Sequence, residues 1–257
     1  MAIFNSGNPT LSEKIFNRSL DGAQDGSTMT VRGSINKFGF LLIMVIAAAS
    51  YTWHLYMVAK PDTMMTFMWV GLIGGLITGL IISFKPNTAR YLAPAYALLE
   101  GFMLGAVSVI VNTMFEKKYP GIVLQAVGLT FAVAFVMFLL YNFRIIKPTE
   151  KFKAVIIGAT LGIFLFYIVY WILSLFGINM PFMSWNDASP LGIGINLFVV
   201  VIAALSLILD FERIETGAAT GAPKQMEWYG AFGLLVTMIW LYIQILKLLS
   251  RIASSRN

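Results

Sequence analysis

The stretch LGIGINLFVVVIAALSLILDFERIE, residues 191–215, decides the fold class. Its first nineteen residues, 191–209, contain no charged side chain. A bilayer core about 30 Å thick is crossed by a helix of about 20 predominantly apolar residues, so this stretch predicts a membrane-spanning helix. Asp210 follows the apolar run directly, and Glu212, Arg213 and Glu215 come after it. The question is what these carboxylates do at the end of a span.

Six further apolar runs have the same length and character. The seven predicted spans are 38–57, 64–84, 91–111, 122–143, 154–176, 191–209 and 228–249. The chain has 58% hydrophobic and 12% charged residues, whereas an ordinary globular domain has about 45–50% and about 25%. We therefore expect an all-α integral membrane protein with seven transmembrane helices, embedded in a lipid bilayer.

The segments outside the spans are short. Residues 1–34 predict an N-terminal tail, 35–250 the seven-helix domain and 251–257 a short C-terminal tail. The tail contains no long apolar core and so does not fit a signal peptide. Within it, residues 13–20 fit a short amphipathic helix at the membrane surface.

The basic residues predict the orientation. With the N-terminus inside, the cytoplasmic segments hold most of the 18 basic residues, and the positive-inside rule therefore predicts the N-terminus in the cytoplasm and the C-terminus outside. Those inside are Lys14, Arg18, Arg32, Lys37, Lys85, Arg90, Arg144, Lys147, Lys151, Lys153, Arg213 and Lys224; those outside are Lys60, Lys117, Lys118, Lys247, Arg251 and Arg256. Because these residues flank spans, we read the net charge of +6 as orientation in the membrane and not as a nucleic-acid surface.

Several kinds of chemistry lack their residues. The chain has no cysteine and one histidine, His54, which excludes thiolate chemistry and a histidine metal cluster. No G-x-S-x-G or H-E-x-x-H motif occurs, and only one clear intramembrane aspartate is present. We therefore expect no enzyme activity and no cofactor.

Small residues predict close helix packing. Glycines spaced four apart, as in Gly71 with Gly75, Gly101 with Gly105 and Gly158 with Gly162, let helix backbones approach. In the last span, small and polar residues recur on one helical face. Such a face is unfavourable toward lipid, so we expect this span near the bundle centre.

Two acids are predicted to lie in or at the membrane. Glu100 is nine residues into its span, roughly 13 Å and so about the midplane, whereas Asp210, roughly 28 Å along its span, should reach the cytoplasmic edge. Intramembrane carboxylates are costly and commonly mark a pathway. Arg90, predicted at a depth similar to Asp210, is a candidate partner across helices, and Arg213 at i+3 is another. Protonation of Asp210 would weaken such a bridge.

The neighbouring acids are predicted to differ from Asp210. Glu212 fits a solvated helix end, and Glu215 an interfacial residue. Glu100 and Asp210 each lie in the third span of a three-span half, which would fit an inverted repeat with the seventh span as the additional helix.

Four stretches carry a resemblance to a known family. They are MTVRGSINKFG (29–39), LLEGFMLG (98–105), LILDFERIE (207–215) and EWYGAFGLLVTMIWLYIQILKLL (227–249). Together they resemble the Bax inhibitor-1 family, in its bacterial YccA-like branch, over about residues 28–250. The resemblance implies two three-helix layers around a central seventh helix, in the bacterial cytoplasmic membrane.

The resemblance also implies a function: a passive, pH-sensitive calcium leak controlled by a pair of aspartates. Asp210 matches the first of that pair, and Arg90 its basic partner. The second aspartate is missing, since the seventh span reads MIWLYIQ, with Trp240, Tyr242 and Gln244 near that position. We expect Glu100 in the pathway with these three residues, and Glu100 and Asp210 as candidate oxygen ligands of a permeant Ca²⁺, a hard cation.

A second function stays open. The YccA-like branch resembles a non-conducting regulatory partner of a membrane AAA protease or of translocon quality control. The cytoplasmic tail, residues 1–32, would then be the part that the protease recognises.

Overall fold

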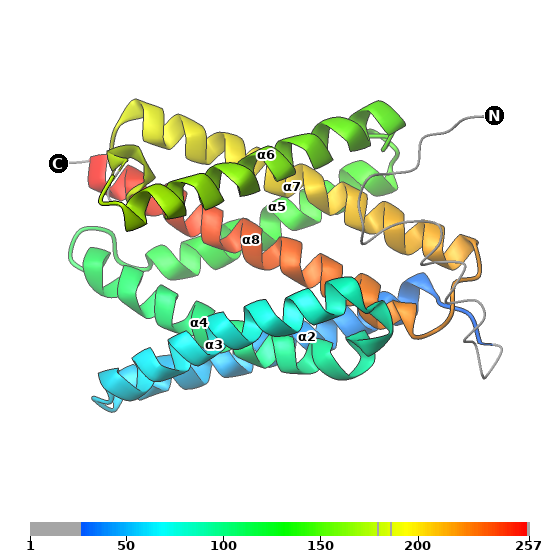
Figure 1. The fold of residues 1–257 in the computed structure, drawn as a ribbon, viewed down its shortest axis with the longest axis horizontal. Coiled ribbons are helices and arrows are strands. Elements are labelled where there is room, and N and C mark those ends of the chain that lie inside the picture. Colours follow the sequence, from blue (N-terminus) through cyan, green and yellow to red (C-terminus); the bar gives the residue numbers. More distant parts are fainter. Residues whose placement is uncertain (1–26, 179, 186, 256–257) are drawn as a thin grey trace. The chain divides into compact units, whose positions relative to one another are not determined.

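The structure, a computed structural model, describes residues 27–178, 180–185 and 187–255. Seven helices in these residues are long and apolar enough to cross a membrane, and no strand accompanies them in that part of the chain (Figure 1). They are α2 (Val31–Met57), α3 (Pro61–Phe84), α4 (Ala89–Phe115), α5 (Ile122–Asn142), α6 (Glu150–Leu175), α7 (Pro190–Ala219) and α8 (Met226–Ser255), with short 3₁₀ turns η1 (Pro86–Thr88) and η2 (Pro181–Met183). The predicted seven-span, all-α fold is confirmed. The predicted surface helix at 13–20 lies outside the described residues.

The helices are longer than the apolar runs that predict them. α7 continues to Ala219, beyond the predicted end at residue 209, and the chain leaves it through Gly221, whose φ of 72° is the left-handed conformation common after helix ends. α2 begins at Val31, because Thr30 caps it: the Thr30 side chain accepts a hydrogen bond from the Gly33 amide. Hydropathy marks the part of a helix inside lipid, whereas capping chemistry ends the helix itself.

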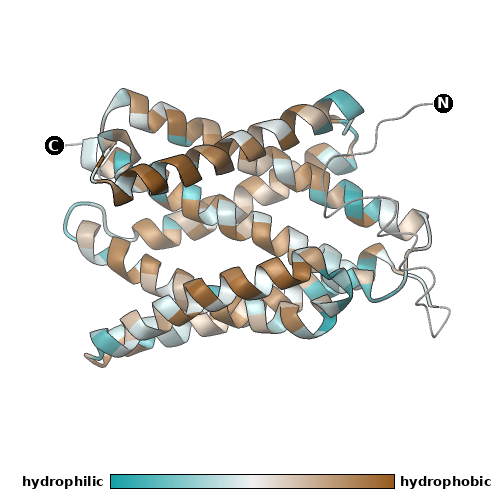
Figure 2. Ribbon diagram, viewed as in Figure 1, coloured by the Kyte–Doolittle hydropathy of each residue, from teal (hydrophilic) through white to brown (hydrophobic). Residues whose placement is uncertain are grey.

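The outward faces of the helices are apolar. Polar residues concentrate toward the helix ends, and hydrophobic residues fill the middles (Figure 2). On α3 and α6, Trp69, Leu76, Phe164 and Trp171 are more than half exposed. Exposed side chains of this size and number fit contact with lipid tails rather than with water.

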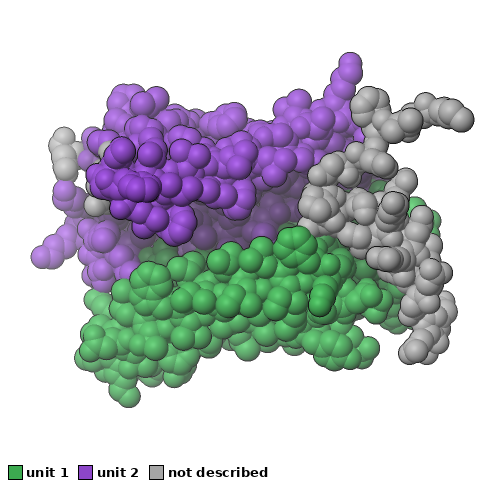
Figure 3. All heavy atoms as spheres, in the orientation of Figure 1, with its two compact units in different colours: residues 1–109, 213–235 green, residues 110–212, 236–257 purple. Residues whose placement is uncertain are grey.

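The chain divides into two compact units (Figure 3). Unit 1 contains residues 1–109 and 213–235, which include α2, α3, most of α4 and the first part of α8. Unit 2 contains residues 110–212 and 236–257, which include α5, α6, most of α7 and the rest of α8. α8 contributes to both units and has the largest buried share of the seven spans, 61%, against 6% for α6. The expected burial of the last span is confirmed.

Glycines set the helix packing inside unit 1. A Cβ atom added at Gly71 would collide with the α4 backbone, and one added at Gly101 or Gly105 with the α2 backbone. These glycines are therefore close-approach positions, as predicted. The prediction is wrong for Gly158 and Gly162 of α6, which have nothing within 4 Å of an added Cβ.

Unit 2 packs around a small apolar cluster. Ile156 of α6 lies with Ile202 and Leu209 of α7, and Trp240 of α8 packs against them. Unit 1 has an apolar cluster of its own, in which Leu55 of α2 lies with Met64 of α3.

Candidate functional site

The residues predicted for the site are divided between the two units. Unit 1 contains Arg90, Glu100, Arg213 and Glu215; unit 2 contains Asp210, Trp240, Tyr242 and Gln244. Asp210 and Arg90 belong to different units, and the predicted bridge between them stays a prediction.

Glu100 lies inside unit 1 on α4. It is eleven residues from the start of that helix, roughly 16 Å along a helix of 27 residues. The side chain is half-buried, and its Oε2 atom is enclosed without a hydrogen-bond partner among the described residues. An enclosed carboxylate oxygen with no donor is costly unless a proton or a cation reaches it.

Two neighbours contact this carboxylate, and a third residue holds one of them. The Tyr96 hydroxyl, one turn earlier on α4, donates a hydrogen bond to it. Gly75 of α3 lies directly against it, since a Cβ added there would be 2.7 Å from Oε1. The Tyr96 ring itself is held edge-on by Phe232 of α8, with 4.9 Å between ring centroids. The carboxylate is therefore positioned by the Tyr96 hydrogen bond and by packing, and no basic side chain of the described residues pairs with it.

Asp210 is buried on α7, only 6% exposed, and the helix continues for nine residues beyond it. The predicted span ended at residue 209, but the helix does not end there, so Asp210 lies within α7. The next residue, Phe211, packs its ring against Phe138 and Tyr141 of α5 in the same unit. A carboxylate in this setting is a titratable group inside a helix, where a change of charge alters packing as well as electrostatics.

Glu212 is not the solvated residue that the sequence predicted. Its Oε1 accepts from the Lys153 Nζ of α6 at 2.6 Å, and Lys153 also contacts Glu150 at 3.0 Å. The sequence could not show this pairing, because it depends on α6 and α7 lying side by side at that depth. The ion pair ties the two helices together within unit 2.

The remaining charged residues predicted for the site lie at or near the surface of unit 1. Arg213 and Arg90 are exposed, and the Arg90 guanidinium lies 5.7 Å from the centroid of the neighbouring Tyr91 ring. Glu215 is half-buried beside Ile214, which packs on Gly230 of α8.

Gln244, a predicted pathway residue, joins two helices of unit 2. The buried Asn196 of α7 donates from Nδ2 to Gln244 Oε1 at 3.0 Å and to the Gln244 carbonyl at 3.2 Å. Trp240 belongs to the apolar cluster around Ile156, and Tyr242 is half-buried. In this structure Gln244 and Trp240 make packing contacts between helices.

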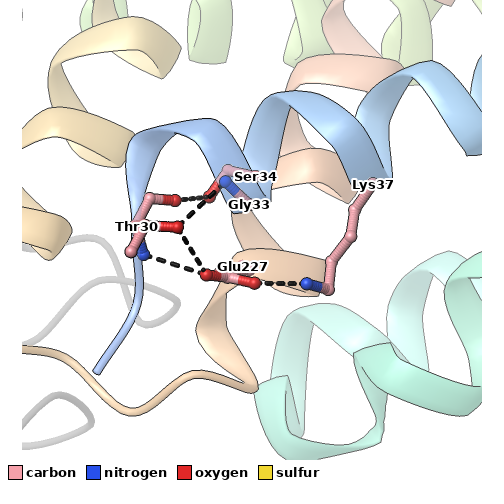
Figure 4. A network of polar contacts seen from close by, with 5 residues as sticks. All are labelled: Thr30, Gly33, Ser34, Lys37 and Glu227. Atoms are coloured by element: carbon pink, nitrogen blue, oxygen red, sulfur yellow. Dashed lines mark hydrogen bonds and ion pairs between the residues drawn. The ribbon is translucent and has the colours of Figure 1, made fainter. Parts of the chain in front are cut away.

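A polar cluster at the start of α2 was missed by sequence reasoning. Glu227 of α8, only 2% exposed, accepts from the Thr30 amide at 2.9 Å and the Thr30 hydroxyl at 3.0 Å, and it pairs with Lys37 (Figure 4). Gly33 lies directly against this acid, because a Cβ at that position would overlap the Glu227 carboxylate, which would then have to move. The only signal in the sequence was one acid directly before the last apolar run.

Two basic residues of α8 have surroundings that the sequence did not predict. Lys247 and Arg251 were assigned only to the outer side of the membrane, and both are buried within the protein, at 7% and 1% exposed. Arg251 donates to the carbonyls of Phe182 (2.6 Å), Ser184 (3.0 Å) and Gly192. It therefore fixes the α6–α7 connection to α8, a role that no hydropathy pattern reveals.

A preformed metal centre is absent from the part of the chain that the structure describes. No three His, Cys, Asp or Glu side chains gather there closely enough to hold a metal ion.

Comparison with known families decides what kind of membrane protein this is. The model of the family described as Bax inhibitor 1 like matches residues 8–254. The chain belongs to the Bax inhibitor-1-like family. The match covers all seven spans and extends to residue 8 in the tail. No curated protein and no solved structure matches the chain.

Proposed function

We propose that this Bax inhibitor-1-like protein is a passive, pH-sensitive cation leak, with calcium as the permeant ion. The single observation that carries the proposal is the enclosed Glu100 oxygen without a donor among the described residues. Oxygen ligands suit a hard cation such as Ca²⁺. A passing cation would relieve the cost of leaving that carboxylate oxygen unpaired.

The geometry favours Glu100 over Gln244 as the pathway residue. Gln244 is occupied by Asn196, and on the same helix Lys247 and Arg251 are basic and buried. Basic side chains along that part of unit 2 would repel a cation. Among the described residues Glu100 has no basic side chain within ion-pair distance, and Tyr96 and Gly75 lie against its carboxylate.

Asp210 is proposed as the gate. Its carboxylate is buried within α7, and protonation would remove a charge from a packed helix. A change of charge in such a position can favour one packing arrangement over another, which is how a local proton event becomes a switch. The family pattern pairs this aspartate with a second one on the last span, which this chain lacks, so Arg90 is the proposed partner.

The test is calcium flux into proteoliposomes loaded with a fluorescent indicator. We expect Glu100→Gln to lower the flux at least tenfold and Asp210→Asn to remove its dependence on pH. Glu116→Gln is the matched control, because Glu116 is an exposed acid that follows α4. Equal flux from the parent protein, Glu100→Gln and protein-free liposomes would end the leak proposal.

The competing proposal is a non-conducting partner of a membrane AAA protease, in which the N-terminal tail is recognised. Deletion of the tail distinguishes this proposal from the leak, and the contacts of residues 29 and 30 determine how much of the tail can be removed. Met29 is buried, its amide donates to the Ala222 carbonyl at 2.7 Å, and Thr30 caps α2. A chain that begins at Ser27 keeps these contacts: a leak should survive this deletion, whereas recognition by a protease should be lost.

A further inference from the structure

A pocket opens on unit 1 beside the start of α2. Its volume is about 580 Å³, within the range of small-molecule sites. The residues that line it are Thr30, Arg32, Gly33, Asn36, Lys37, Phe40, Lys224, Glu227 and Trp228. They come from α2, from the connection between α7 and α8, and from the first turn of α8.

The charge in this pocket is predominantly positive. Its lining contains three basic side chains, Arg32, Lys37 and Lys224, and one carboxylate, Glu227. Glu227 is only 2% exposed and is already paired with Lys37 and bonded to Thr30 (Figure 4). Arg32 and Lys224 are exposed, and no ion pair to either is found among the described residues. The accessible part of the pocket therefore offers two cations whose charge is not neutralised there.

One wall of the same pocket is aromatic. Phe40 and Trp228 meet edge to face with ring centroids 6.2 Å apart, and the Lys37 Nζ lies 5.5 Å from the centroid of the Trp228 ring. Phe40 is 49% exposed and Ile43, one turn further along α2, is 66% exposed. The pocket thus stands where the polar end of α2 gives way to its lipid-facing part. Tryptophan is enriched at this level of a membrane.

We propose that this pocket binds the phosphate headgroup of an anionic phospholipid. Exposed Arg32 and Lys224 would contact the phosphate, and Phe40 with Trp228 would contact the glycerol and the first acyl carbons. Basic pockets between transmembrane helices on the cytoplasmic side are suited to such headgroups, and the positive-inside rule places this end of unit 1 there. Free inorganic phosphate shares the anionic chemistry but has no apolar part to meet the aromatic wall. The inference is independent of the proposed leak.

Glu227 has a defined part in this site. By holding Lys37 and Thr30 it fixes the start of α2 against α8, which sets the spacing of the pocket walls. Contacts within the protein therefore hold the pocket walls in place.

The test uses the absence of cysteine in this chain. Asn36→Cys puts a single thiol in the pocket wall, to be labelled with a small fluorophore in full-length protein in phosphatidylcholine nanodiscs. Brominated phosphatidylglycerol is then compared with brominated phosphatidylcholine as a quencher. We expect quenching at a much lower fraction of the anionic lipid. In the Arg32→Gln, Lys224→Gln double variant this preference should fall roughly 30-fold at low salt, about fivefold for each basic residue.

A matched pair of single variants separates the pocket from general surface charge. Lys224→Gln and Lys85→Gln each remove one exposed lysine from a connection at the same end of unit 1, where Gln225 and Asn87 are hydrogen-bonded at 3.1 Å. Only Lys224→Gln should lower the preference. Equal losses from both variants, or no preference for phosphatidylglycerol in the parent protein, would overturn the proposal. A response to inorganic phosphate without preference for the anionic lipid would also overturn it, in favour of a free-anion site.

Discussion

The Glu100 carboxylate lies against Gly75 so closely that one added carbon would displace it. A Cβ at Gly75 would be 2.7 Å from Glu100 Oε1 and 3.2 Å from its carboxyl carbon. A helix surface without a side chain is therefore a condition for the position of the one acid proposed to meet a cation.

Gly75→Ala should accordingly lower calcium flux as Glu100→Gln does, although it removes no charge. The alanine forces the Glu100 carboxylate out of its present position, and the gain in helix propensity, about 1 kcal/mol, does not restore that position. The measurement is proteoliposome flux beside thermal unfolding in detergent. Gly158→Ala is the control, since nothing lies within 4 Å of that position; equal flux from both variants would contradict the assigned role of Gly75.

The bond between Asn196 and Gln244 predicts a structural effect. Gln244→Leu should lower the free energy of unfolding by about 0.6 kcal/mol and by at most about 1.7 kcal/mol, the average and the maximum found for interhelical hydrogen bonds in a membrane protein. A double-mutant cycle with Asn196→Leu should return a coupling energy of that size between the two residues, since both side chains are buried and bonded to each other. A coupling of zero would show that the two residues act independently.

Arg251 predicts a larger loss. Arg251→Met leaves the carbonyls of Phe182 and Ser184 without their donor and should cost about 1–3 kcal/mol. Arg251→Lys keeps the charge but not the forked geometry, so it should restore only part of that stability. Lys117→Met, at an exposed position, is the control and should change stability by less than about 0.5 kcal/mol. Equal unfolding temperatures for Arg251→Met and the parent would contradict the role.

The pair of Lys37 with Glu227 predicts that one end of α2 loosens when it is broken. Glu227→Gln keeps the shape and an acceptor for Thr30 but removes the charge facing Lys37, and should cost about 1–3 kcal/mol. Amide hydrogen exchange should rise at the first turns of α2 and stay unchanged in α6. Uniformly faster exchange throughout the chain would instead indicate a global loss of stability.

The predicted orientation can be measured with single cysteines in this cysteine-free chain. Lys224→Cys should be shielded from a membrane-impermeant maleimide in intact cells, and Lys117→Cys should react with it. Both positions are exposed and lie in connections on opposite sides of a seven-span topology. The reverse labelling pattern would place the N-terminus outside.

The sequence by itself determined the number and order of the spans, because apolar runs of about 20 residues have one stable solution in a bilayer, the helix. It also singled out Glu100, a charge inside an apolar run, and Asp210, a charge directly after one. It placed close-approach glycines correctly in α3 and α4, yet the same spacing in α6 has no partner. A spacing rule reports that a helix can be approached; it cannot report that another helix is there.

Only the tertiary structure decided which polar residues face one another. Glu212 pairs with Lys153, and Gln244 accepts a hydrogen bond from Asn196. Arg251 donates hydrogen bonds to the carbonyls of the connection between α6 and α7. These pairs join segments far apart in the chain, and a lone polar residue in a sequence carries no sign of its partner. Hydropathy is a sum over local residues and fixes where a helix crosses lipid. Pairing depends on the rotation and depth of two helices at once, and these are set by packing.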